Sequence, residues 1–133
     1  MTPRYFTRAE AEALLPVVEP ILREIQRCAA ELVALQQRMA AERTKAMGNG
    51  HAHRDGADDP GAQARLCEQR MRDALTDLNA RGIEVKDLAT GLIDFPSLRD
   101  GRVVLLCWRL GEPRIAWWHE VDAGFAGRAP LED

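Results

Sequence analysis

The hydrophobic positions in the first third of the chain recur in steps of three and four residues. They are Val18, Ile21, Ile25, Cys28, Leu32, Leu35 and Met39. This spacing is typical of a coiled-coil-like helix and predicts one long helix that runs to about Ala46. Thr7 and Glu10 have the spacing of a capping box, so the helix should begin at Thr7. Because proline lacks an amide hydrogen and clashes with the preceding turn, Pro16 predicts a break or kink near Leu15, or the start of a second helix.

A second helical pattern follows a polar segment. Residues 48–61 contain four glycines, one proline and no large apolar residue, which indicates a flexible and dispensable loop. A helix is then predicted over 62–81, ended by a left-handed cap at Gly82, because apolar residues again recur at helical spacing: Ala64, Cys67, Met71, Ala74 and Leu78. Two helices with matching apolar sides and a flexible connection predict an antiparallel hairpin.

The pattern becomes strand-like over residues 83–133. An extended piece over 91–96 should end at its proline, and two β-favouring apolar runs follow at 103–108 and 114–121. These runs should pair as an antiparallel hairpin around Gly111 and Glu112.

The turn at Gly111 sets a register in which Val104 lies opposite His119. His119 should then share a sheet face with Val104, Leu106 and Trp108, and should be neutral and withdrawn from water. Both faces of the predicted hairpin are apolar, and a second subunit is the simplest cover for the face that the helices leave open. We therefore expect a homodimer.

These elements predict a single α+β domain over 1–133, with a long antiparallel helical hairpin packed on a small antiparallel β-sheet. A chain of 133 residues that is 46% hydrophobic suits one such domain. The formal charge of −3 supplies no positive excess for a nucleic-acid backbone, so we expect no nucleic-acid partner. No apolar run approaches the roughly 20 residues of a membrane span, and the amino terminus lacks a signal pattern, which favours a cytoplasmic protein.

Polar side chains in the apolar strands are the candidates for chemistry, because a buried charge is costly unless it is paired or used. The candidate metal ligands are Asp94, Cys107, Glu112 and His119, which together could bind a divalent ion such as zinc or iron. No helical ligand motif supports them. The alternative is structural: His119 donates to a backbone carbonyl or to Asp94, its preferred partner, and Cys107 packs as a small apolar residue. We favour this alternative and expect no cofactor, with a divalent metal as the exception.

Other residues could bind a small ligand. Arg128 could clamp a carboxylate or phosphate, although an ion pair with Asp94 or Glu120 is favoured. Aromatic side chains, above all Trp108 and Trp118, could stack on a flat ligand, although residues at strand spacing are more often core. His51 and His53 could hold a metal only loosely, and we expect no site there. No phosphate loop or nucleophile elbow is present, so enzymatic activity is left open and is not favoured.

Two blocks of the sequence resemble a known family. The opening block is Tyr5, Phe6, Thr7, Glu10, Ala11, Leu14, Leu15 and Pro16, and the closing block includes residues 91–96, 106–108, 118–119 and 124–131. The chain resembles an uncharacterised bacterial family of the DUF2203 type over almost its whole length. The resemblance implies a small cytoplasmic bacterial protein with a helical hairpin and a sheet, and it supplies no activity that can be carried over to this chain.

The expected function is therefore a non-catalytic, homodimeric structural or interaction module whose protein partner the sequence does not identify. The alternative is a metal- or small-ligand-binding protein, perhaps an enzyme. Its site would lie around Asp94, Cys107, His119 and Arg128.

Overall fold

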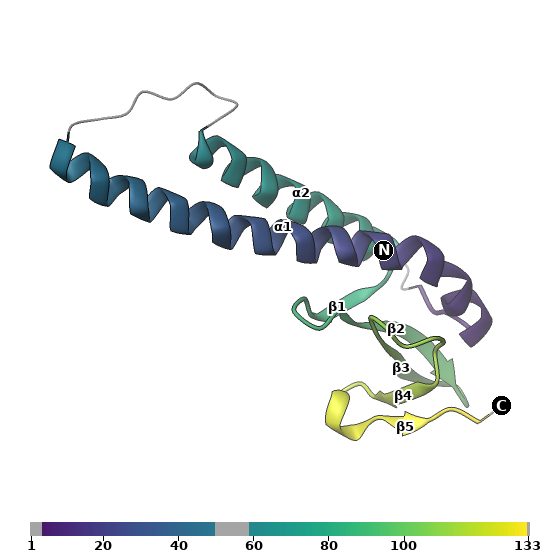
Figure 1. The fold of residues 1–133 in the computed structure, drawn as a ribbon. Coiled ribbons are helices and arrows are strands. Elements are labelled where there is room, and N and C mark those ends of the chain that lie inside the picture. Colours follow the sequence, from purple (N-terminus) through teal and green to yellow (C-terminus); the bar gives the residue numbers. More distant parts are fainter. Residues whose placement is uncertain (1–3, 50–58, 133) are drawn as a thin grey trace.

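The computed structural model describes residues 4–49 and 59–132 of the chain, and within these ranges two helices precede a five-stranded sheet (Figure 1). The strand order is β1-β2-β3-β4-β5, and each strand is antiparallel to its neighbour. The elements are α1 (Arg8–Asn49), α2 (Pro60–Ala80), β1 (Glu84–Asp87), β2 (Leu92–Arg99), β3 (Arg102–Arg109), β4 (Trp117–Glu120), the short 3-10 helix η2 (Phe125–Gly127) and β5 (Ala129–Pro130). The predicted α+β class, with a helical hairpin on an antiparallel sheet, is confirmed.

Helix α1 begins at the predicted capping box. The Glu10 amide donates to the Thr7 hydroxyl at 3.1 Å, and the Thr7 amide donates to the Glu10 carboxylate at 2.8 Å. The predicted break near Leu15 is wrong, because α1 continues through Pro16 and Pro20. A proline inside a helix costs about 3 kcal/mol, and burial of the apolar side of α1 against α2 and the sheet outweighs this cost.

The two helices pack along their apolar sides and extend beyond the sheet (Figure 1). Asp59 caps α2, and its side chain accepts from the Gly61 amide at 2.9 Å. Helix α1 extends past the predicted Ala46 and α2 begins before the predicted residue 62, so both ends of the expected loop are helical. Residues 50–58, which contain most of that loop with His51 and His53, lie outside the described residues.

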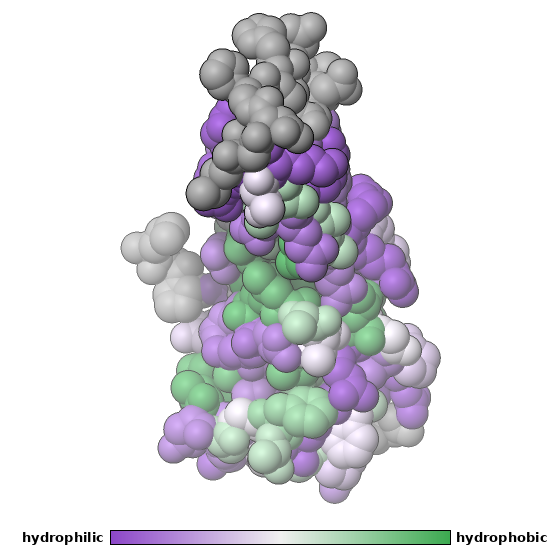
Figure 2. Space-filling view, turned by 60° about the vertical axis from the view of Figure 1, so that its left-hand side comes forward, coloured by the Kyte–Doolittle hydropathy of each residue, from purple (hydrophilic) through white to green (hydrophobic). Residues whose placement is uncertain are grey.

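The main core lies between the first half of α1, the end of α2 and one face of the sheet. Its sheet residues include Ile93, Phe95, Leu106 and Trp108, all of which are buried. In the view of Figure 2, hydrophilic side chains dominate the far end of the helical hairpin, and hydrophobic ones gather lower, toward the sheet. The sheet therefore has one face packed on the helices and one face turned away from them.

The β2–β3 hairpin is closed by a tight Asp-Gly turn. Asp100 and Gly101 form the two-residue loop between the paired Arg99 and Arg102, and both loop residues have positive φ, at 53° and 78°. These values fit the Asp-Gly turn that matches the twist of a hairpin.

Strand β2 continues past Pro96, so the prediction that this proline stops the strand is wrong. The Pro96 carbonyl accepts from the Phe6 amide at 2.7 Å. That side of Pro96 therefore faces away from β3, and the missing amide hydrogen removes no bond from the β2–β3 ladder.

The predicted β3–β4 register is wrong by one residue. His119 lies opposite Leu105, Trp118 opposite Leu106 and Trp117 opposite Cys107. Strand β4 begins at Trp117 after a longer connection than the predicted two-residue loop. Since side chains alternate between faces, this shift moves His119 away from the helices and turns Trp118 toward them.

Candidate metal centre

Three side chains meet on the sheet face turned away from the helices. Asp94 comes from β2, Cys107 from β3 and His119 from β4, and one ligand atom of each lies within 4.8 Å of the others. Asp94 and Cys107 are cross-strand partners, and His119 lies two positions along the same face. The three are buried, with exposed fractions of 1%, 0% and 3%. Three adjacent strands thus bring together a carboxylate, a thiol and an imidazole.

Hydrogen bonds fix the orientation of the His119 ring. Its Nδ1 lies 2.7 Å from the Glu120 carbonyl oxygen, and because a carbonyl can only accept, Nδ1 carries the hydrogen. Its Nε2 lies 3.1 Å from both carboxylate oxygens of Asp94, which confirms the predicted partner. With Nδ1 protonated, the neutral imidazole turns a lone pair toward a carboxylate that also accepts. A proton or a cation must therefore lie between Nε2 and Asp94.

The surroundings of the cluster favour its protonated forms. Burial raises the pKa of Asp94 above its ordinary value, although the charges of His119 and Lys86 act in the opposite direction. Burial, followed by the charge of Asp94, raises the pKa of the Cys107 thiol from 9.0 to about 12, against an opposing effect of Arg128. Without a cation at the site, Cys107 is a thiol at neutral pH.

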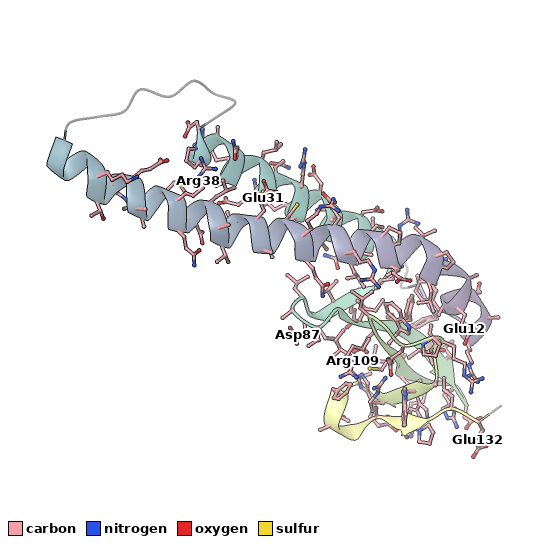
Figure 3. The ribbon with its side chains drawn as sticks, viewed as in Figure 1. Glu12, Glu31, Arg38, Asp87, Arg109 and Glu132 are labelled. Atoms are coloured by element: carbon pink, nitrogen blue, oxygen red, sulfur yellow. The ribbon has the colours of Figure 1, made fainter. Side chains whose placement is uncertain are left out.

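Aromatic and cationic side chains from the end of the chain lie beside the cluster. The Arg128 guanidinium stacks on the rings of Trp117 and Phe125, at 4.8 Å and 4.6 Å from their centroids, and Trp117 is the cross-strand partner of Cys107. Figure 3 shows Arg109 at the end of β3, beside the segment that carries η2, and its guanidinium lies 5.6 Å from the Phe125 ring. The segment with η2 therefore packs along the sheet face that carries the cluster.

Arg128 pairs with Glu112, which was predicted to be a metal ligand. Its Nη2 donates to the two carboxylate oxygens of Glu112 at 2.9 Å and 3.2 Å, so the predicted pairing with Asp94 or Glu120 is wrong. Glu112 also accepts from the Arg109 amide at 2.7 Å. Glu112 is therefore not grouped with the candidate ligands in the described part of the chain.

The candidate ligand-binding residues Arg128, Trp108 and Trp118 make different contacts in the structure. Trp108 is buried in the core that faces the helices, and its indole nitrogen donates to the Glu112 carbonyl at 3.0 Å. Trp118 packs against the same core and lies under the Arg99 guanidinium at 4.6 Å. Arg128 instead stacks on Trp117.

The group formed by Glu112, Trp117, Phe125 and Arg128 could not be seen in the sequence pattern. No spacing rule connects these residues, because they belong to β4 and to the loops around it. The WW pair at 117–118 is a strand signal, but it does not show which ring turns outward until the register is known.

The donor set is chemically suited to a transition metal. Thiolate, imidazole and carboxylate are the three ligand types of zinc in proteins, and a histidine whose other ring nitrogen donates to a carbonyl is held with the ligating nitrogen free. The same cluster can also stand as a proton-sharing pair of His119 and Asp94 beside a buried thiol.

Comparisons with known proteins give a family and no activity. A family model described as "Uncharacterized conserved protein (DUF2203)" matches residues 4–131. No curated protein and no solved structure matches the chain. Within residues 4–49 and 59–132, neither helix combines the length and the apolar character that crossing a bilayer requires.

Proposed function

We propose that this chain, which belongs to the uncharacterised conserved protein family DUF2203, binds one divalent transition-metal ion through Asp94, Cys107 and His119. The observation that carries the proposal is the convergence of oxygen, sulfur and nitrogen donors within 4.8 Å on three adjacent strands. Zinc fits this mixed set well, and iron(II) is another metal that such ligands accept.

The orientation of His119 supports a metal ion between its Nε2 and the Asp94 carboxylate. A hydrogen bond from Nδ1 to the Glu120 carbonyl fixes the tautomer that leaves Nε2 free to ligate. The metal would replace the proton that the imidazole and the carboxylate otherwise share.

Metal binding would also change the protonation state of the Cys107 thiol. A buried thiol with a pKa of about 12 stays protonated at neutral pH when no metal is bound. A metal ion supplies the positive charge that makes the thiolate stable in the interior. Metal binding should therefore release about two protons, one from Cys107 and one from the pair of His119 and Asp94.

Metal content of protein purified without an affinity tag tests the proposal. We expect one equivalent of zinc or iron in the wild type and its loss in Cys107→Ser, Asp94→Asn and His119→Ala. Cys28→Ser is the matched control, because Cys28 is also a buried thiol but lies in the core between the two helices. A protein that takes up no metal even when zinc or iron is supplied, or a Cys107→Ser variant that keeps its metal, would contradict the proposal.

A second candidate is an interaction module that acts as a homodimer, and exposed apolar side chains at the end of the sheet favour it. Leu98 and Val103 are cross-strand partners with exposed fractions of 54% and 36%, and Val121 directly follows β4 with 59%. Light scattering at micromolar concentration should give twice the chain mass of 14.8 kDa. A monomeric mass would remove this candidate.

We further infer a bacterial and cytoplasmic setting for the protein. Its three cysteines are free thiols, which suits a reducing compartment.

A further inference from the structure

Arg128 has a buried donor without a partner. Its Nε makes no hydrogen bond in the described part of the chain, although the atom is shielded from solvent. The Arg128 side chain is 11% exposed, and its Nη2 is already bound to Glu112. Buried polar atoms are almost always hydrogen-bonded, so an unpaired guanidinium donor indicates an acceptor that residues 4–49 and 59–132 do not supply.

The unpaired donor lies next to the proposed metal site. The guanidinium is held by stacking on Trp117 and Phe125 and by its ion pair with Glu112. Trp117 is the cross-strand partner of Cys107, so the ring on which Arg128 stacks lies on the same face of the sheet as the Cys107 side chain. The Arg128 charge also acts on the Cys107 thiol. The guanidinium is therefore fixed in place beside the cluster rather than free in solvent.

The metal site needs a further ligand. Tetrahedral zinc takes four ligands, and the described residues place three together. A fixed guanidinium beside the cluster favours an anion as this further ligand, since arginine binds carboxylates and phosphates through charge-assisted and often bidentate hydrogen bonds.

We propose that a small oxyanion, either a carboxylate or a phosphate, completes the site by binding the metal ion with one oxygen and accepting from Arg128 with another. This inference rests on the proposed metal binding. The segment between β4 and β5, which contributes Phe125 to the stack on Arg128, is exposed at every residue from Val121 to Gly127.

The test uses the full chain loaded with cobalt(II), whose visible absorption reports its ligands. Acetate and phosphate are titrated separately, with chloride at matched ionic strength as the reference. We expect acetate or phosphate to change the spectrum in a saturable way, and the anion that does so identifies the oxyanion class. Arg128→Met should lower the affinity for that anion by about tenfold or more while cobalt stays bound.

The matched control is Arg99→Met. Arg99 also stacks on a tryptophan, Trp118, but that ring packs against the core on the helix side of the sheet. The control should bind the anion as the wild type does. If Arg128→Met fails to fold, Arg128→Lys replaces it, since lysine keeps the positive charge but has no Nε donor. This variant should also lower the affinity for the anion.

The outcomes separate the two proposals. Bound cobalt whose spectrum neither anion changes, or equal anion affinity in the wild type and the Arg128 variant, overturns the oxyanion inference and leaves metal binding intact. A chain that binds no cobalt overturns the metal proposal and the oxyanion inference together.

Discussion

At the residue scale, the pairing of His119 with Asp94 could be predicted because a buried imidazole among apolar neighbours needs a partner and few polar residues lie in the strands. The contacts of Arg128 could not be predicted. Glu112, Trp117 and Phe125 reach it from β4 and its flanking loops, and nothing in their spacing indicates that these side chains meet. Candidate ligands within the apolar strands are thus visible in the sequence, whereas the residues that surround them depend on loop conformation.

The raised pKa of Asp94 predicts how stability changes with pH. In the metal-free protein the folded state keeps a proton on Asp94 at pH values where the unfolded chain, with a carboxyl pKa near 3.8, has lost it. The stability from Asp94 is therefore fully present below that value and is lost as the pH rises through the raised folded pKa. Urea unfolding of the metal-free wild type and Asp94→Asn should show this fall only in the wild type.

Metal loading should reverse the sign of this pH dependence. The metal ion competes with the protons of Asp94, Cys107 and His119, so its stabilising effect grows as the pH rises.

Parallel stability curves for the metal-free wild type and Asp94→Asn would contradict the metal-free prediction, because they would show that the Asp94 carboxyl titrates alike in the folded and unfolded chains.

At the element scale, the helices and the order of the strands follow from the apolar pattern, but their exact limits and register do not. Local rules predicted a break or kink near Leu15 and a strand end at Pro96, and in both places the surrounding packing keeps the element continuous. The register failed because the connection before β4 is longer than a two-residue turn. A slip of one residue is enough to place His119 on the wrong face.

Substitutions at two glycines of the sheet region distinguish the cost of backbone strain from the cost of a steric clash. Gly91 and Gly101 both have positive φ, at 71° and 78°. A Cβ at Gly91 would lie 2.6 Å from the Leu110 Cβ, whereas a Cβ at Gly101 would meet nothing within 4 Å. We expect Gly101→Ala to cost about 1 kcal/mol of unfolding free energy and Gly91→Ala clearly more. Equal losses in urea unfolding would contradict the close approach of Leu110 to Gly91.

At the scale of the whole molecule, the two faces of the sheet have different roles. The helix-facing side holds the core residues Ile93, Phe95, Leu106 and Trp108, which stabilise the fold. The opposite side holds the buried cluster of Asp94, Cys107 and His119, together with the aromatic and cationic side chains beside it. The class of the fold was predictable from composition and period, whereas this division depends on a register that only the three-dimensional structure supplies.

Identifying the ligands of the bound metal tests most directly whether Asp94, Cys107 and His119 form a metal centre. X-ray absorption at the zinc edge of the zinc-loaded full chain should show one sulfur at about 2.3 Å and the remaining ligands as nitrogen or oxygen at about 2.0–2.2 Å. One sulfur corresponds to Cys107, with His119 and Asp94 among the lighter ligands. A zinc ion with no sulfur ligand, or with two or more, would contradict the proposed centre.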